Sequence, residues 1–218
     1  MSREGQQLSY WNPDELWVGK QVVILGGGPS LKRVNLGLLR STFSEKERII
    51  IGLNDAYLLD SIVDLDVVFW GDNVWLEHHR KFLNAAGPAF AKITCQSTQP
   101  LAVDNVLWVQ RRPDGLWKKG RIGWNWSTGA AAINLALLMG SKEIVLLGFD
   151  MKDEEGMNNW HPNLINPPPN KKLRELQFSG FATVAKELPE KFPEARVYNA
   201  TEGTSLKCFN LVRLEDVL

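Results

Sequence analysis

The chain alternates short apolar runs with segments whose apolar residues recur at helical spacing. Residues 20–25 (KQVVIL) are apolar and β-rich, and they end abruptly in Gly26-Gly27-Gly28-Pro29-Ser30. In the segment that follows, LKRVNLGLLRSTF, apolar side chains return at helical intervals. This order predicts a strand, a glycine turn and a helix.

The same alternation of strand and helix continues along the chain. Segment 142–150 (KEIVLLGFD) has no polar alternation, which predicts a strand covered on both faces, as in a parallel sheet. Segment 127–140 predicts a helix with Ser127 or Thr128 as N-cap and Gly140 as C-cap. Further strands are predicted at 47–53, 66–72, 90–95, 106–110 and 195–200, and further helices at 55–62, 73–87 and 172–188.

Strands that alternate with helices in one direction predict the α/β class, a Rossmann-like, doubly wound and mostly parallel sheet. The 218 residues suit a single domain, 1–218, in which 1–19 form an N-terminal extension. Segment 151–170 is a polar loop of unusual length, and such loops are usually functional. We expect it and the tryptophan-rich loop 111–126 to act as lids.

Composition excludes several classes of protein. Lys plus Arg and Asp plus Glu both number 25, so no global field attracts duplex nucleic acid. The apolar runs are far shorter than the roughly 20 residues that cross a bilayer. The N-terminus MSREGQQLSYW lacks the apolar stretch of a signal peptide, and two cysteines cannot form a disulfide framework. We therefore expect a cytoplasmic protein without a membrane span.

Candidate ligand-binding residues follow the predicted strands, because ligands of open parallel sheets bind beyond the carboxyl ends of the strands. The three glycines at 26–28 let the backbone approach a ligand, and amides that open a helix favour an anion. No Gly-Lys-Ser/Thr follows, and Leu31 stands where a dinucleotide fingerprint needs a third glycine. The turn predicts a nucleotide or phosphate site, with a purely structural turn as the alternative.

Other polar residues at predicted strand ends and helix starts extend this site. Asn54 and Asp55 suit a ribose or a base edge, and Ser127-Thr128-Gly129 suits a base or a second anion, with helix capping as the alternative for both. Asp150 and Asp153 resemble a carboxylate pair for a divalent metal, with a solvated acidic loop as the preferred alternative, so no metal ligand is assigned. The predicted nucleotide-binding residues are Gly26, Gly27, Gly28, Pro29, Ser30, Asn54, Asp72, Ser127, Thr128, Gly129 and Asp150.

The three histidines differ in their setting. His78 and His79 are adjacent on a predicted helix, about a hundred degrees apart, so they suit surface positions better than a shared metal. His161 lies in the long loop just beyond a strand. A neutral imidazole there could take the proton of an acceptor hydroxyl, so we predict a catalytic base, with a loop-ordering hydrogen bond as the alternative.

The loop 111–126 combines basic and aromatic residues. The loop contains five Lys and Arg residues but a single acid, Asp114, and the basic residues are interleaved with Trp117, Trp124 and Trp126. Such a mixture suits a phosphate, a sugar ring or a single-stranded nucleic acid. The alternative is a solvated loop whose tryptophans fold onto the core.

Three blocks of the chain resemble known families. VVILGGGPSLK (22–32) resembles the opening of family 42 sialyltransferases, whose first strand ends in a Gly-Asn-Gly-Pro-Ser-Leu turn that holds CMP; here Gly27 replaces the Asn. Segment 127–151 resembles the Ser-Gly-opened helix of the same family and its following strand, which ends in Gly-x-Asp. VYNATEGTSLKCF (197–209) is similar to the 6-hydroxymethylpterin diphosphokinase MptE-like family, a mostly uncharacterised group of prokaryotes and phages.

This resemblance implies a function. The 26–30 turn would cradle the phosphate or ribose, Asn54 would match the Asn after the second strand, 127–129 would meet the base or ribose, and His161 falls where the sialyltransferases keep a general base. We expect a nucleotide-dependent transferase, foremost a glycosyltransferase that joins a nucleotide-activated sugar to a small-molecule or glycan acceptor without a permanently bound cofactor. One alternative is a diphosphokinase for a small alcohol such as a pterin, with Mg²⁺ held by Asp72, Asp150 or Asp153. The other is a non-catalytic nucleotide-binding module.

Overall fold

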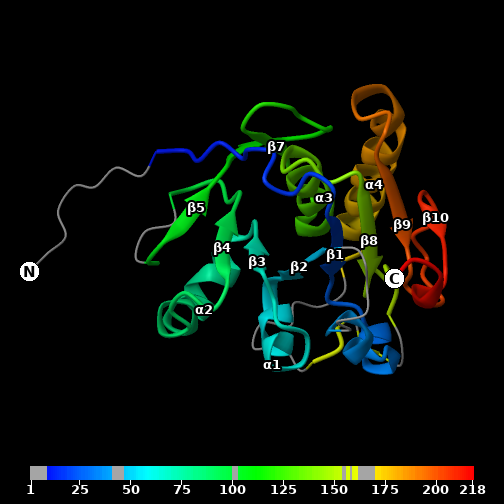
Figure 1. Cartoon of the computed structure of the whole chain (residues 1–218), viewed down its shortest axis with the longest axis horizontal. Coiled ribbons are helices and arrows are strands. Elements are labelled where there is room, and N and C mark those ends of the chain that lie inside the picture. Colours follow the sequence, from blue (N-terminus) through cyan, green and yellow to red (C-terminus); the bar gives the residue numbers. More distant parts are fainter. Residues whose placement is uncertain (1–8, 41–46, 100–102, 154–155, 158, 162–169) are drawn as a thin grey trace, which may run out of the picture.

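The computed structural model describes residues 9–40, 47–99, 103–153, 156–157, 159–161 and 170–218. Its main feature is an eight-stranded sheet in the order β10-β9-β8-β1-β2-β3-β4-β5, in which every pairing is parallel (Figure 1). The strands are β1 (Gln21–Leu25), β2 (Arg48–Leu53), β3 (Val67–Trp70), β4 (Ala91–Thr94), β5 (Val106–Trp108), β8 (Glu143–Leu147), β9 (Arg196–Asn199) and β10 (Asn210–Leu211). A separate parallel pair comprises β6 (Gln110–Arg112) and β7 (Arg121–Gly123).

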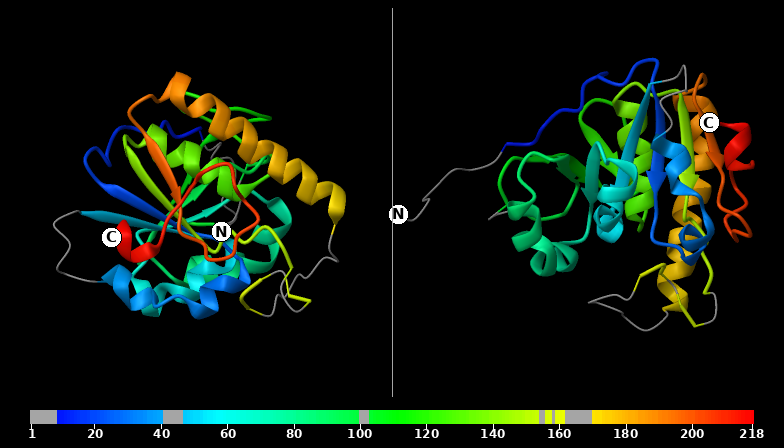
Figure 2. Two further views of the ribbon diagram at one scale, coloured as in Figure 1. Left: turned by 90° about the vertical axis from the view of Figure 1, so that its right-hand side faces the viewer. Right: turned by 60° about the horizontal axis from the view of Figure 1, so that its bottom comes forward.

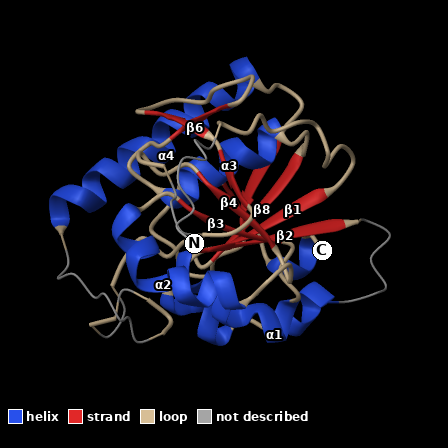
Figure 3. Ribbon diagram, turned by 90° about the vertical axis from the view of Figure 1, so that its left-hand side faces the viewer, coloured by secondary structure: helices blue, strands red, loops and turns tan. Residues whose placement is uncertain are grey.

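Helices cover both faces of the sheet. The α-helices are α1 (Asp60–Val63), α2 (Asn73–Ala85), α3 (Thr128–Leu138) and α4 (Lys171–Lys191), and the 3₁₀ helices are η1 (Pro29–Arg33), η2 (Leu36–Arg40), η3 (Asn54–Leu59) and η4 (Leu214–Asp216). The long α4 lies on one side of the strands and the short blue and cyan helices lie on the other (Figure 2). Figure 3 shows α3 beside α4 and α2 beside α1, with the sheet between the two pairs.

Alternation along each strand builds the two layers of the core. In β1, Val22 and Ile24 join the cluster under α3 and α4, whereas Val23 and Leu25 join the cluster on the opposite face. All four side chains are fully buried, as expected of a strand covered on both faces. The predicted Rossmann-like, doubly wound α/β fold is confirmed.

The helix predicted directly after the glycine turn is present as two short 3₁₀ helices in place of one continuous helix. The segment forms η1 and η2, with Val34 between them in an extended conformation. Pro29 opens η1, and the Asn35 side chain accepts a hydrogen bond from the Gly37 amide at 3.2 Å. Such local side-chain bonds compete with the helical ladder, so the apolar spacing was right but the helix type was not.

The C-terminal tail packs back on the end of β8. Thr201 Oγ1 accepts a hydrogen bond from the Phe149 amide at 2.9 Å, and Thr204 Oγ1 donates one to the Phe149 carbonyl at 2.6 Å. The Ser205 amide donates to the Asp150 carbonyl at 2.8 Å. The threonines of the VYNATEGTSLKCF block therefore hold the end of β8 in place.

The strand order places a topological switch point between β1 and β8. The chain proceeds from β1 to β5 on one side of β1 and from β8 to β10 on the other. In open parallel sheets, the crevice beyond the carboxyl ends of the strands at such a point is the usual ligand site. None of the helices in the described ranges is both long enough and apolar enough to cross a bilayer.

Candidate functional site

A cavity of about 850 Å³ opens at the carboxyl ends of β1, β2 and β8. The start of α3, the first turns of α4 and the described part of the loop after β8 complete its wall. His161 lines it, as do nine of the predicted nucleotide-binding residues: Gly26, Gly27, Gly28, Asn54, Asp72, Ser127, Thr128, Gly129 and Asp150. Pro29 and Ser30 are buried behind it and do not line it.

The amides of the glycine turn are mostly committed within the protein. The Gly26 amide donates to the Leu147 carbonyl at 2.7 Å, the Gly28 amide to the Gly148 carbonyl at 2.8 Å, and the Ser30 amide to Asp150 Oδ1 at 3.1 Å. In the described part of the chain, the Gly27 amide has no such acceptor, and Gly27 is the one residue of the turn that is not fully buried. The anion-binding capacity of this turn therefore rests on Gly27.

Asp150 and Asp153 do not form the metal-binding pair considered from the sequence. Asp150 is 1% exposed, and its second carboxylate oxygen accepts a hydrogen bond from Ser30 Oγ at 2.7 Å. Asp153 instead pairs with Arg174 at 2.5 Å. The expectation of a solvated acidic loop was wrong for Asp150. No group of three or more potential metal ligands is found among the described residues.

Capping explains two of the predicted residues. The Asp72 carboxylate accepts a hydrogen bond from the Val74 amide at 3.0 Å at the start of α2, and Ser127 Oγ accepts one from the Ala130 amide at 3.4 Å at the start of α3. Asn54 is different, because it is the first residue of η3 rather than its N-cap. It has a φ of 49°, and its buried Oδ1 has no hydrogen-bond partner among the described residues. Strain of this kind in a non-glycine residue is typical of functional sites.

His161 and Asp55 meet at the cavity wall. His161 Nε2 lies 3.3 Å from Asp55 Oδ2, and the His161 side chain is 8% exposed. The other oxygen, Asp55 Oδ1, lies 2.9 Å from Trp75 Nε1 and 3.1 Å from His79 Nε2. Asp55 thus links the predicted base to a buried histidine on α2.

The expectation that His79 is a surface residue was wrong. His79 is 6% exposed and stacks on Trp75, with ring centroids 4.5 Å apart. Trp75, His79 and Leu83 are spaced four residues apart and all face the core, a periodicity visible in the sequence. His78, next to it, is exposed as predicted.

Burial changes the acidity of two groups beside Asp55. It lowers the pKa of His79, although the Asp55 charge opposes that change. It also raises the pKa of Tyr57, whose hydroxyl lies 3.0 Å from His79 Nδ1. Both groups are therefore held neutral next to a carboxylate.

Basic residues line the side of the cavity formed by α4 and the loop before it: Lys152, Lys171, Lys172 and Arg174. Asn170 caps α4, with its side chain accepting from the Leu173 amide at 3.0 Å. Helix N-termini and cations both favour anions. This wall is not evident from the sequence, because its residues are brought to the cavity only by the path of α4 across the sheet.

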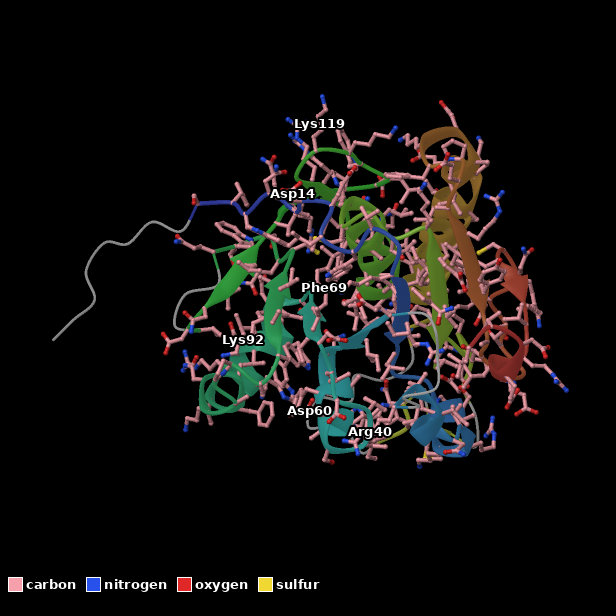
Figure 4. The ribbon with its side chains drawn as sticks, viewed as in Figure 1. Asp14, Arg40, Asp60, Phe69, Lys92 and Lys119 are labelled. Carbon is pink, nitrogen blue, oxygen red and sulfur yellow. The ribbon has the colours of Figure 1, made fainter. Side chains whose placement is uncertain are left out.

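The middle of the loop 111–126 lies beyond the cavity along α4: the Leu116 amide donates to Glu187 Oε2 at 2.6 Å, whereas the residues of α4 that line the cavity lie between Lys171 and Phe181. The start of the loop lies closer, since Arg111 Nη1 donates to the Gly71 carbonyl at 3.1 Å, beside Asp72 of the cavity wall. Figure 4 shows Lys119 at the end of the molecule opposite to Asp60. No residue of this loop lines the cavity, and its role as a lid stays a prediction.

The aromatic residues of this loop hold its own cations. Arg111 lies 4.3 Å from the ring centroid of Trp124, and Arg112 and Arg121 lie 5.5 and 5.7 Å from that of Trp117. Trp124 also packs against the core, as the alternative had it, whereas Trp126 is 48% exposed. Of the other predicted lid, 151–170, residues 154–155, 158 and 162–169 lie outside the described residues.

Comparison with known proteins supports the fold. No protein-family model matches the chain, and no curated protein sequence matches it. The solved structure of a MAf glycosyltransferase from Magnetospirillum magneticum AMB-1 is similar, with a TM-score of 0.63 and 15% identity. The match covers 96% of this chain and 36% of that one, so the chain spans about a third of its length. The two proteins share a Rossmann-like α/β fold.

Proposed function

We propose that the chain is a nucleotide-dependent transferase that moves a sugar from a nucleotide to an acceptor hydroxyl. The observation that carries the proposal is the His161–Asp55 pair, 3.3 Å apart, on the wall of a cavity at the β1–β8 switch point. A histidine held by a carboxylate is the usual arrangement for a general base.

The cavity has features that suit a nucleotide-activated donor. Its volume of about 850 Å³ lies within the range of small-molecule sites, roughly 300–1,000 Å³. The Gly27 amide and the basic wall of Lys152, Lys171 and Lys172 would bind the phosphate. The polar Asn54 side chain would bind the ribose or base. These contacts would hold the donor with its sugar toward His161.

The reaction needs one proton acceptor and one stabilised leaving group. His161 takes the hydroxyl proton of the acceptor, whose oxygen forms a bond to the anomeric carbon of the donor. The bond from that carbon to the nucleotide phosphate breaks, and its electron pair leaves with the nucleotide. Asp55 stabilises the imidazolium, and the basic wall stabilises the phosphate that leaves.

The similar solved protein is itself named a glycosyltransferase, which agrees with this proposal. The diphosphokinase alternative has less support, because it needs carboxylates for Mg²⁺. Both carboxylate oxygens of Asp150 accept hydrogen bonds from Ser30, and Asp153 forms an ion pair with Arg174, so both carboxylates already have partners. A nucleotide-binding module without turnover is the other alternative, and activity measurements distinguish it.

The proposal is tested by incubating the full chain with CMP-, UDP-, GDP- and ADP-linked sugars and a mixture of hydroxyl acceptors. Nucleotide release and product mass are measured by chromatography and mass spectrometry. We expect His161→Ala to lower turnover by about 10²–10⁴-fold, the usual contribution of a general base, while nucleotide affinity is retained.

His78→Ala is the matched control, because His78 is an exposed histidine on α2 that does not line the cavity. Its turnover should equal that of the parent chain. Nucleotide binding without turnover of any donor would favour the module. Full activity of His161→Ala would remove the base from the mechanism.

A further inference from the structure

We infer that Tyr57 and His79 are positioning residues, which fix the Asp55 carboxylate against His161 through a directed chain of hydrogen bonds. The catalytic consequence rests on the proposed function. The direction of the hydrogen bonds rests on the geometry and the burial of the described residues and not on the proposed function. Neither residue lines the cavity, so neither can touch a substrate.

The series of hydrogen bonds runs from the core to the cavity wall. The Tyr57 hydroxyl on η3 lies 3.0 Å from His79 Nδ1 on α2. His79 Nε2 lies 3.1 Å from Asp55 Oδ1, and Asp55 Oδ2 lies 3.3 Å from His161 Nε2. Trp75 Nε1 donates to Asp55 Oδ1 at 2.9 Å.

The position of each hydrogen follows from the chemistry of the groups. A carboxylate only accepts hydrogen bonds, so His79 Nε2 must carry a hydrogen. The His79 ring is 6% exposed and stacked at 11° on Trp75, and this burial keeps it neutral. A neutral ring with its hydrogen on Nε2 has its lone pair on Nδ1, so the Tyr57 hydroxyl donates to that atom. Every hydrogen bond of the chain therefore points toward Asp55.

A purely packing role would not require this chain. Burying a histidine and a tyrosine hydroxyl costs free energy unless each polar atom finds a partner. Leu83, on the same face of α2, fills the core without any polar atom. Here the polar atoms are joined in series and end on the carboxylate that faces the predicted base.

This series of hydrogen bonds determines which ring nitrogen of His161 carries the hydrogen. Two donors occupy Asp55 Oδ1, which leaves Oδ2 to accept from His161 Nε2 and so fixes the tautomer of that ring. The proton-accepting lone pair of a neutral His161 is then on Nδ1. Without the Tyr57 hydroxyl, His79 Nδ1 loses its hydrogen-bond donor, so the ring is held at its Asp55 side alone and is less firmly oriented.

The direction of the chain can be tested by NMR without any substrate. The chain has three histidines, so ¹⁵N-histidine labelling gives three rings, which His78→Gln and His161→Asn assign. We expect His79 to be neutral at pH 7 with its hydrogen on Nε2, and Tyr57→Phe to move the Nδ1 resonance, because Nδ1 loses its donor, while the hydrogen stays on Nε2. An Nδ1–H tautomer in the parent chain, or an unchanged Nδ1 resonance in Tyr57→Phe, would overturn the inference.

The positioning role is tested by kinetics on the donor that the parent chain turns over. Tyr57→Phe and His79→Leu should lower kcat by about 10–100-fold, as for other outer-shell partners, with KM unchanged. His79→Gln keeps an N–H donor toward Asp55 and should recover most of that loss. Phe82→Leu is the packing control, because Phe82 stacks on Tyr57 at 4.0 Å without a hydrogen bond.

Equal loss in His79→Gln and His79→Leu, or loss in Phe82→Leu as large as in Tyr57→Phe, would assign the two residues to packing and overturn the positioning role. Failure of the proposed function has a different signature. In that case the parent chain turns over no donor, while the NMR result still decides whether the hydrogen-bond chain is directed as inferred.

Discussion

At the scale of single residues, the three glycines of the turn differ in what an added side chain would contact. A Cβ on Gly26 would lie 2.5 Å from the Gly148 carbonyl oxygen, and one on Gly28 would lie 1.8 Å from Asp150 Oδ2. A Cβ on Gly27 would meet only the end of the Asn159 side chain, at 2.7 Å. Gly26 and Gly28 thus allow β1 to pack against the end of β8, and Gly27 faces the cavity.

If Gly28 served only to leave space for a ligand, Gly28→Val would block ligand binding and leave the fold intact. The structure predicts instead that Gly28→Ala alone destabilises the fold by about 1–3 kcal/mol, because the added methyl group overlaps Asp150. Urea unfolding followed by tryptophan fluorescence measures this. An unchanged unfolding midpoint would show that Asp150 moves aside at no cost.

His79 predicts a pH dependence of stability. Burial lowers its pKa below the ordinary value of 6.5, so the unfolded chain binds this proton more tightly than the folded protein. The contribution of neutral His79 to the free energy of unfolding is complete above pH 6.5. It is lost as the pH falls below that value, by at most about 1.4 kcal/mol per pH unit. The charge of Asp55 opposes the lowering of this pKa, and charges on His78 and His161 add to it.

The measurement is the unfolding free energy of the parent chain and of His79→Gln between pH 5 and 8. The difference between their slopes below pH 6.5 isolates His79, since the other groups are common to both proteins. Parallel curves would mean that His79 takes up its proton equally in both states, contrary to its burial.

At the scale of elements, Asn134 joins the loop 111–126 to α3. It is fully buried, its Oδ1 accepts from the amides of Trp117 and Gly123 at 2.9 and 3.0 Å, and its Nδ2 donates to the Trp117 carbonyl at 2.9 Å. A lone polar residue in the apolar stretch of this helix marks such a contact. It positions the loop on the outer side of α3.

Asn134→Leu should destabilise the protein by about 2–4 kcal/mol, because it leaves two amides and a carbonyl without partners. Hydrogen exchange at the Trp117 and Gly123 amides should accelerate with it. Thr183→Ala is the control, because it removes an exposed hydrogen bond on α4 and should leave both quantities unchanged. Slow exchange of both amides in Asn134→Leu would contradict this account.

The longer strands and α-helices were predictable from local pattern, and the contacts between them were not. Apolar runs such as VVIL and the Ser127 cap identify β1 and α3 because the signal lies within a few residues. The Asp55–His79 contact joins residues 24 positions apart whose approach depends on the packing of η3 against α2. The Ser30–Asp150 bond likewise requires β1 and β8 to be neighbours, which the strand order decides.

At the scale of the whole molecule, the reactivity of the two cysteine thiols can be used to follow unfolding of the sheet. Cys95 follows β4 and is fully buried, which raises its pKa to about 12, whereas Cys208 is exposed. One thiol should react with a disulfide reagent in the native state, and the second only as the protein unfolds. Reaction of both thiols in buffer would contradict the burial of Cys95.

The central claim is that the cavity at the β1–β8 switch point binds a nucleotide through the Gly27 side of the turn. Calorimetric titration with CMP, UMP, UDP, GDP, ADP and ATP tests it most directly, on the parent chain, Gly27→Val and the exposed control Gly37→Val. We predict that at least one nucleotide binds the parent chain and Gly37→Val equally and binds Gly27→Val at least about tenfold more weakly, or about 1.4 kcal/mol. Binding of no nucleotide, or equal binding to all three proteins, would contradict the account.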